Sequence, residues 1–331
     1  MNEKSIYEQL HESALPADRK KLLSDIFSGE KLPSICYDVV AKHVFSPDLH
    51  PERMNFILQH TMNQPDIEVD KSASNEIYLQ NIYSKKTITD LPAWLRDNRL
   101  ADLAFQRNAQ EFIYDRADIY ASNMLLLQYS AEANQPKCDI DYKNVHGTII
   151  IVLMEHSPKS FRNFESRRYI HRITKAHADS GLELEMLKQM VFVQLDKALD
   201  LYLTHNYNED EDVELLELFA FIADVNNESI INKAQNNNLL SGIREDVFKF
   251  TRDKEVQSMI LAEDLAIMDW NSNMRFAREE GEADGEAKIV TLNKWLVSQG
   301  RTNDILQYTE DPAYLNTLLA EYDAAKAMPQ A

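Results

Sequence analysis

The run from Thr148 to Glu155, TIIIVLME, constrains the fold of this chain more than any other stretch. Its interior is continuously apolar and rich in β-branched residues, without the alternation of a half-exposed strand. Such a run predicts a central strand that is covered on both faces of its sheet. His146-Gly147 leads into it and Ser157-Pro158 ends it. The run therefore predicts an α/β domain built around this strand.

A β-hairpin and a long helix are predicted ahead of this strand. Thr87 to Leu95 and Leu100 to Gln106 form the two strands of the hairpin. Arg96-Asp97-Asn98 provides the turn, because Asn and Asp tolerate left-handed backbone. A helix with apolar residues at helical spacing extends from about Asn108 to Glu132. Later strands are expected at 166–178 and 191–195. This order of elements predicts a mixed α/β sheet.

Helical patterns flank the sheet region on both sides. Residues 4 to 31 show helical spacing with a break at Pro16, and the chain is helical from Lys197 onward. A long helix is expected from Gly242 to about Glu280, followed by an exposed, charged link at 278–288. Short helices are expected at 289–296 and 314–322. The chain is thus divided into an N-terminal helical cap at 1–33, an α/β core at 34–200, a helical region at 201–280, and a charged linker with a small helical tail at 281–331.

Composition narrows the classes of function. The 35 basic and 54 acidic residues give a net charge of −19. A protein that coats nucleic acid needs clustered Lys and Arg to neutralise phosphates, so this balance argues against bulk nucleic-acid binding. It leaves room for a nuclease, because a local basic patch can coexist with a negative total and a metal site needs carboxylates of its own.

Other motifs point to a cytoplasmic protein without zinc. No apolar run approaches the roughly 20 residues that a membrane span requires, and the N-terminus lacks the apolar core of a secretory signal. Cys36 and Cys138 provide neither a disulfide framework nor a cysteine zinc site. The nine histidines show no zinc spacing, and no nucleophile elbow or glycine-rich phosphate loop occurs.

Several stretches, in order, resemble the PD-(D/E)xK nuclease family transposases, also described as recombination-promoting nucleases. The resemblance covers roughly residues 34 to 300, and it implies a restriction-endonuclease-like core of mixed β-sheet flanked by helices, with a largely helical C-terminal half. The stretches that carry it are YDVVAKHVFSPDLHPERMNFIL, ADLAFQRNAQEFIYDRADIYASNMLLLQYS, TIIIVLMEHSP, DSGLELEMLKQMVFVQLD and FAREEGEADGEAK. Residues at the positions that recur in the family are Asp38, Lys42, Phe45, Arg116, Tyr120 and Gln128.

The resemblance implies a metal-dependent site on the hairpin. In the family, an Asp on the first strand and a Glu-x-Gln or Glu-x-Lys on the second hold Mg²⁺, which activates a water to cut a DNA phosphodiester. Asp90 matches the metal-binding Asp, and Gln106 matches the water-orienting residue. The position of the Glu is Ala104. The implied cofactor is Mg²⁺, or Mn²⁺ in its place, and the implied partner is DNA.

Ala104 leaves three explanations open. The substitution is engineered, or catalysis was lost naturally, or another acid has taken over. Asp102 lies two residues earlier on the same strand face, and Glu111 lies near the start of the next helix. We favour inactivation, because Asp102 occupies a different level of the strand and Glu111 would have to reach across the helix start.

The register of the hairpin decides whether the site can form. Asp90 and Ala104 face each other only if the turn has an odd number of residues or contains a bulge. A two-residue turn at Asp97-Asn98 would instead pair Asp90 with Phe105. The sequence leaves both registers open.

Supporting residues have two interpretations. Arg116 and Tyr120, four apart on one helix face, either brace the sheet or contact phosphate. Asp38 and Lys42 form either an ordinary pair on one helix or an approach to the site. Asp102 is included in the same supporting group.

The sequence thus predicts a Mg²⁺-dependent DNA endonuclease of the recombination-promoting type that is inactivated at Ala104. The alternative is a non-catalytic protein that keeps the nuclease fold and binds another protein through its acidic, helical surface. Glu at position 104 of the natural gene would indicate an engineered knockout, and Ala would favour the binding role. An apolar stripe on the helix after Gly242 leaves a homodimer open, which would suit an enzyme that cuts two strands.

Overall fold

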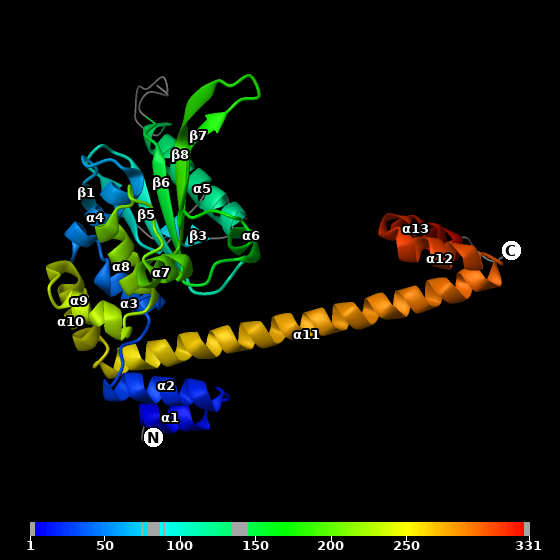
Figure 1. Ribbon diagram of the computed structural model, residues 1–331, viewed down its shortest axis with the longest axis horizontal. Coiled ribbons are helices and arrows are strands. Elements are labelled where there is room, and N and C mark those ends of the chain that lie inside the picture. The colour runs from blue at the N-terminus through cyan, green and yellow to red at the C-terminus, as the bar shows by residue number, and fades with distance from the viewer. Residues whose placement is uncertain (1–3, 74–75, 78–86, 89, 134–144, 328–331) are drawn as a thin grey trace. The chain divides into compact units, whose positions relative to one another are not determined.

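The chain forms two compact units, Met1–Glu263 and Asp264–Ala331. The computed structural model describes residues 4–73, 76–77, 87–88, 90–133 and 145–327 (Figure 1). None of the described helices combines the length and the apolar content that a membrane span requires.

The first unit contains a six-stranded mixed sheet of order β1-β4-β5-β6-β8-β7. β5, β6 and β8 are parallel, and the pairs β1–β4, β4–β5 and β7–β8 are antiparallel. A separate two-stranded ladder joins β2 to β3. The strands are β1 Val69–Ser72, β2 Glu76–Ile77, β3 Thr87–Ile88, β4 Pro92–Leu95, β5 Leu100–Gln106, β6 Thr148–Met154, β7 Ile170–His177 and β8 Glu183–Gln194.

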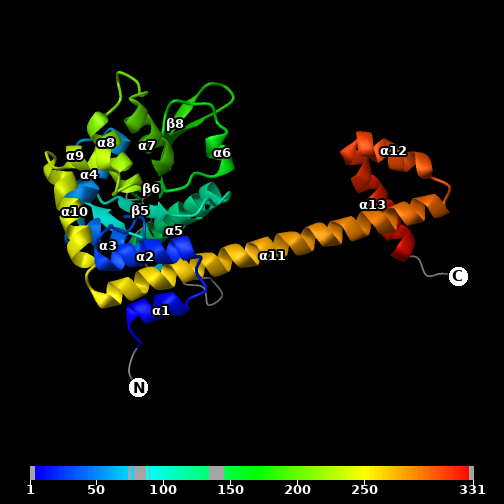
Figure 2. The same cartoon turned by 60° about the horizontal axis from the view of Figure 1, so that its bottom comes forward.

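The central strand is the one that the sequence predicts. β6 lies between β5 and β8, and every residue from Thr148 to Met154 is buried. Helix α5, Ile113–Ala133, covers one face, where Ile150, Val152 and Phe192 pack against Ala117 and its neighbours. Helices α4, α7 and α8 lie on the other face, as both views show (Figures 1 and 2). Burial on both faces explains why the run needs no polar alternation.

The remaining helices of the first unit surround this core. Pro16 precedes α2, where its missing N–H costs little, so the predicted break at this residue is confirmed. The helices are α1 Ile6–Glu12, α2 Ala17–Ser28, α3 Asp38–Val44, α4 Pro51–Met62, α6 Lys159–Arg162, α7 Leu195–Thr204, α8 Val213–Ala223, α9 Glu228–Ala234 and α10 Asn238–Phe250.

Several predicted boundaries are wrong. The first hairpin strand is interrupted, because the chain bends at Asp90 and Leu91 before β4 begins. β8 begins at Glu183, well before the predicted 191, and its outer half forms a twisted ribbon with β7. The helix predicted from Gly242 to Glu280 is two helices. Its break lies at 251–253, where the Asp253 carboxylate accepts the backbone N–H of Glu255 and so favours a new helix start.

The second unit is helical. α11, Lys254–Ser298, begins in the first unit and continues without a break through the predicted link at 278–288. α12, Thr302–Glu310, was not predicted, and α13 spans Pro312–Ala327. A small core joins these three helices: Leu292 and Leu296 of α11 pack with Leu318 of α13, and Ile305 and Tyr308 of α12 pack against them. The Tyr308 hydroxyl donates to Asn293 Oδ1 at 2.8 Å and connects α12 to α11.

Two glycines give opposite predictions for substitution by alanine. A Cβ at Gly147 would lie 2.8 Å from the backbone oxygen of Leu187, whereas a Cβ at Gly285 in α11 would meet nothing within 4 Å. Gly147→Ala should therefore destabilise the first unit by about 1–3 kcal/mol through overpacking. Gly285→Ala should stabilise α11 by about 0.5–1 kcal/mol through helix propensity. Urea unfolding of the two variants checks both signs, and equal signs would contradict the structure.

Candidate site on the hairpin

The turn between β4 and β5 has an odd number of residues. Leu95 N–H donates to Arg99 O at 2.9 Å and Asn98 N–H donates to Leu95 O at 3.0 Å, so the loop is Arg96-Asp97-Asn98. Asn98 adopts left-handed backbone at φ 65°, as three-residue hairpin loops require. The register pairs Pro92 with Asp102. The register that permits the site is therefore the one observed.

The chain leaves this ladder just before the acid. Continuing the register would place Asp90 opposite Ala104, but the backbone bends at Asp90 and Leu91. The Asp90 side chain then replaces a backbone hydrogen bond of the ladder, because its carboxylate Oδ2 accepts the backbone N–H of Phe105 at 2.9 Å. In return, Asp102 Oδ1 accepts the backbone N–H of Leu91 at 3.0 Å. Each carboxylate thus bonds to the strand that carries the other.

The second strand directs its even-numbered residues towards α5. Side chains alternate along a strand, so Asp102, Ala104 and Gln106 share one face, and Ala104 packs against the core beneath α5. Phe105 points the other way and stacks on Phe45 at 5.5 Å between ring centroids. The predicted site residues of β5 therefore lie on one face, and Ala104 presents a methyl group there.

Helix α5 supplies the predicted Arg116 and Tyr120 to this face. Arg116 Nη1 donates to Gln106 Oε1 at 3.1 Å, and Arg116 Nε donates to the Tyr120 hydroxyl at 3.1 Å. Gln106 Nε2 donates to the backbone oxygen of Asn108 at 3.0 Å. These bonds hold the Gln106 amide in a fixed orientation. Arg116 thus braces β5 against α5 with two of the five N–H donors of its guanidinium, so bracing and a phosphate contact are compatible.

Burial and neighbouring charges shift the pKa values of Asp90 and Asp102. Burial, followed by the charge of Asp90, raises the pKa of Asp102 to about 7. Burial also raises the pKa of Asp90, while the Phe105 N–H and the Arg116 charge lower it. Asp102 is 0% exposed, and its Oδ2 has no hydrogen-bond partner among the described residues. The hairpin thus holds two carboxylates that oppose each other's ionisation.

Helix α3 brings the predicted Asp38 and Lys42 into electrostatic range. Lys42 Nζ lies 2.8 Å from Asp38 Oδ1 in a pair four residues apart. The Asp38 charge raises the pKa of Asp90 and the Lys42 charge lowers it. Glu111, considered above as a replacement acid, is exposed and instead accepts the backbone N–H of Lys159 at 3.1 Å.

A half-buried charge network beside the site was not predicted from the sequence. Arg107 follows Gln106, and its guanidinium lies 3.3 Å from Glu155, 2.9 Å from Glu263 and 3.7 Å from the ring centre of Tyr37. The Ser34 hydroxyl donates to Glu155 at 2.7 Å. The sequence does place an arginine directly after β5 and a glutamate directly after β6, two adjacent parallel strands. This spacing indicates an ion pair only once the register of the two strands is known.

The hairpin offers two carboxylates as protein ligands for a Mg²⁺ ion. Among the described residues, no group of three or more His, Cys, Asp or Glu side chains could hold a metal ion. Mg²⁺ needs fewer, because it is usually bound through one or two carboxylates plus waters. Asp90 and Asp102 provide two, and the unpartnered oxygen of Asp102 is an acceptor that only a cation, a proton or water can satisfy.

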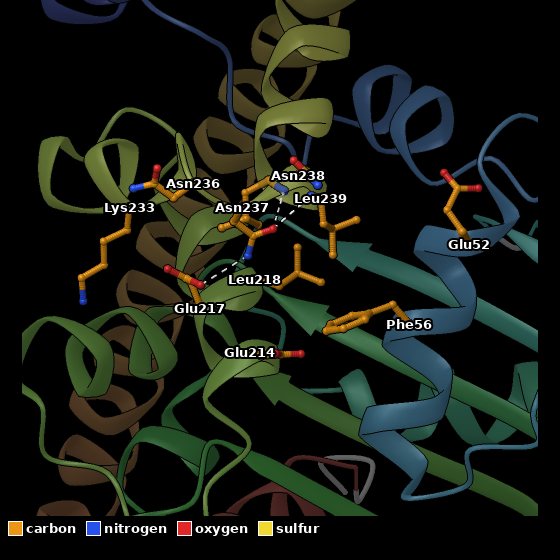
Figure 3. Close-up of a pocket in the computed structure, with 11 residues that line it drawn as sticks. Glu52, Phe56, Glu214, Glu217, Leu218, Lys233, Asn236, Asn237, Asn238 and Leu239 are labelled. Carbon is orange, nitrogen blue, oxygen red and sulfur yellow. Dashed lines mark hydrogen bonds between the residues drawn. The ribbon is translucent and has the colours of Figure 1, made fainter.

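A pocket lies elsewhere on the first unit. It has a volume of about 640 Å³ and lies among α4, α8, α9 and the start of α10 (Figure 3). Two of its polar side chains bond to each other, because Glu217 accepts from Asn237, which also caps α10. Glu217 accepts in addition from Tyr202, which does not line the pocket. None of the hairpin residues lines it, so we treat it as separate from the candidate site.

Comparisons with protein-family models, with curated proteins and with solved structures give no match to this chain. The case for a function therefore rests on the hairpin site itself.

Proposed function

We propose that this chain is a PD-(D/E)xK-type protein of the recombination-promoting class whose Mg²⁺-dependent hydrolysis of DNA is lost at Ala104. One observation carries the proposal. Asp90, Gln106 and Arg116, which the resemblance assigns to the site, converge on one hairpin and one helix, and Ala104 lies among them in the position assigned to the second acid.

Each residue has a defined task in such a site. When bound, Mg²⁺ would activate a water and neutralise charge on the phosphate being cut. Asp90 supplies one carboxylate, anchored by the Phe105 N–H. Gln106, held by Arg116, orients a water through its amide. The methyl group of Ala104 supplies neither a ligand nor charge, so the reaction lacks one of its two expected acids.

Restoring the acid tests the proposal directly. Ala104→Glu should create nicking of supercoiled plasmid DNA in Mg²⁺ or Mn²⁺, at least about tenfold above the unaltered chain. Adding Asp90→Ala should abolish that activity, because the remaining acids then lack their anchor ligand. Ala277→Glu, which adds the same charge to an exposed face of α11, serves as the matched control and should stay inert.

The opposite outcome supports the alternative function. If folded Ala104→Glu remains inert with both cations, the hairpin is structural and the nuclease proposal fails. The chain would then be better described as a nuclease-fold protein that binds another protein through its acidic surface, which the net charge of −19 favours.

A further inference from the structure

We propose that a cavity beside α9 and α10 binds a small amphipathic carboxylate, a molecule with one apolar end and one carboxylate group. None of the hairpin residues lines this cavity. The inference therefore goes beyond the proposed function, and it involves neither DNA nor a metal ion.

The cavity has a volume of about 340 Å³, which lies at the small end of the range for ligand pockets. One face of α10 lines it through four residues at helical spacing, Ser241, Arg244, Glu245 and Phe248. Helix α9 and Leu32, in the segment between α2 and α3, supply the rest of the lining. α9 and α10 lie side by side in both views (Figures 1 and 2).

Four apolar side chains make part of this lining suitable for a hydrocarbon group. Leu32 and Ala234 are buried, Ile231 is half-buried, and Phe248 is 41% exposed. An apolar ligand would gain dispersion contacts with these walls and would remove the exposed part of the Phe248 ring from water. The lining therefore favours a ligand with an apolar end.

Arg244 determines the charge of the ligand. Among the described residues it is the only cation in the lining, and no acid pairs with it. Its Nη1 donates to the backbone oxygen of Val225 at 3.4 Å, which is long for a hydrogen bond. Glu245 does not neutralise it, because this exposed acid pairs with Lys249 at 2.5 Å. The Arg244 guanidinium thus keeps N–H donors for an anionic ligand.

The surroundings add positive charge and favour a carboxylate over a phosphate. The Arg252 guanidinium lies 4.7 Å from the centre of the Phe248 ring, and its Nη1 donates to the backbone oxygen of Ser28. The planar fork of an arginine matches the two oxygens of a carboxylate. One arginine in the lining balances the single charge of a carboxylate, whereas a phosphate monoester carries nearly two.

Hydrogen bonds hold the Leu32 side of the cavity in place. The Asn226 side chain accepts the Leu32 N–H at 3.0 Å and donates to the Leu32 backbone oxygen at 2.8 Å. These two bonds tie the segment between α2 and α3 to the loop ahead of α9. A lining that is already ordered reduces the entropy cost of binding a small ligand.

Octanoate is the probe that tests the inference. Isothermal titration calorimetry of the full chain should show one saturable site with a Kd below about 1 mM. 1-Octanol has the same chain length without the charge, so it should bind at least about tenfold more weakly. Octanoate binding should also weaken as salt is raised, whereas 1-octanol binding should not.

Two substitutions remove the two halves of the site. Arg244→Met keeps an apolar stem without the charge, so it should weaken octanoate binding at least about tenfold and leave 1-octanol binding unchanged. Ser241→Leu adds volume to the α10 wall and should abolish binding of both molecules. Leu is the better helix former, and the Ser241 hydroxyl bonds only within α10 to Asn238, so this variant should fold. Arg275→Met, at an exposed arginine of α11, is the matched control and should bind both molecules as the unaltered chain does.

A measurement on the unaltered chain avoids dependence on the folding of variants. In a methyl-labelled sample, nuclear Overhauser effects should connect the hydrocarbon chain of octanoate to the methyl groups of Ile231 and Ala234. Absence of these effects, equal affinity for octanoate and 1-octanol, or unchanged octanoate binding in either Arg244→Met or folded Ser241→Leu would overturn the inference.

Discussion

Arg107→Ala should lower the free energy of unfolding of the first unit by about 3 kcal/mol, because it leaves two half-buried acids without their shared cation. Arg107 is 13% exposed at its side chain and contacts Glu155 and Glu263, which are 15% and 24% exposed. Burial already raises the pKa of Glu263, and the Arg107 charge opposes that rise. Without Arg107, both acids must be protonated or remain charged in a poorly solvated place.

The position of Arg107 makes the effect larger than that of an ordinary ion pair. It joins the end of β5 to α11 through Glu263 and to the end of β6 through Glu155. Its guanidinium also lies over the Tyr37 ring, ahead of α3. One substitution therefore loosens contacts among segments that are far apart in sequence.

A surface pair provides the control for this prediction. Arg96 lies 2.6 Å from Glu68, with both side chains well exposed, so Arg96→Ala should cost less than about 1 kcal/mol. Urea unfolding, followed by circular dichroism, compares the variants. Equal losses for Arg107→Ala and Arg96→Ala would show that the network contributes no more than a surface pair.

The second large effect concerns pH. In the folded chain the pKa of Asp102 is about 7, against an ordinary 3.8. Between about pH 4 and pH 7 the folded state thus holds a proton that the unfolded state has released, so the stability from Asp102 falls as pH rises through this window. One pKa unit corresponds to about 1.4 kcal/mol. Asp102→Asn should therefore gain up to about 3 kcal/mol over the unaltered chain between pH 5 and pH 8.

The pH experiment on Asp102→Asn must take account of the charged groups around Asp102. Asp90 and Arg116 act on it directly, while Asp38 and Lys42 act on Asp90. Unfolding is measured in EDTA, because a bound cation would stabilise the ionised acids. Asp97→Asn on the same hairpin should show no such pH-dependent gain. A constant difference between Asp102→Asn and the unaltered chain would mean that Asp102 does not titrate in this range.

The sequence is sufficient to predict the central strand of the sheet, because one continuous apolar run determines how that strand is buried. The run at Thr148–Met154 has no polar position, so only a strand covered on both faces accommodates it. The helix after the hairpin and the helical character of the chain from α7 onward follow from periodicity, whereas the break at 251–253 and α12 do not. The resemblance also leads to Asp90 and Gln106, which the fold brings to one hairpin with Arg116 beside Gln106.

The arrangement of the acids could not be predicted in the same way. The odd loop depends on the left-handed conformation of Asn98, which the sequence permits but does not require. The bend at Asp90 depends on hydrogen bonds between side chains and the opposite backbone, which become visible only when the strands are paired. For this reason the sequence favours Ala104 as a simple loss, and the structure directs attention to Asp102.

The parity of the hairpin loop has a consequence for how this protein can diverge. Side chains at the site can change one at a time, and under the proposed function Ala104 is such a change. Loop length cannot change as freely, because adding or removing one residue among 96–98 would shift the pairing of β4 with β5 by one position and separate Asp90 from Asp102. Insertions that preserve this geometry should come in twos. Spacing at this turn should therefore persist longer than the identity of any single side chain on the hairpin.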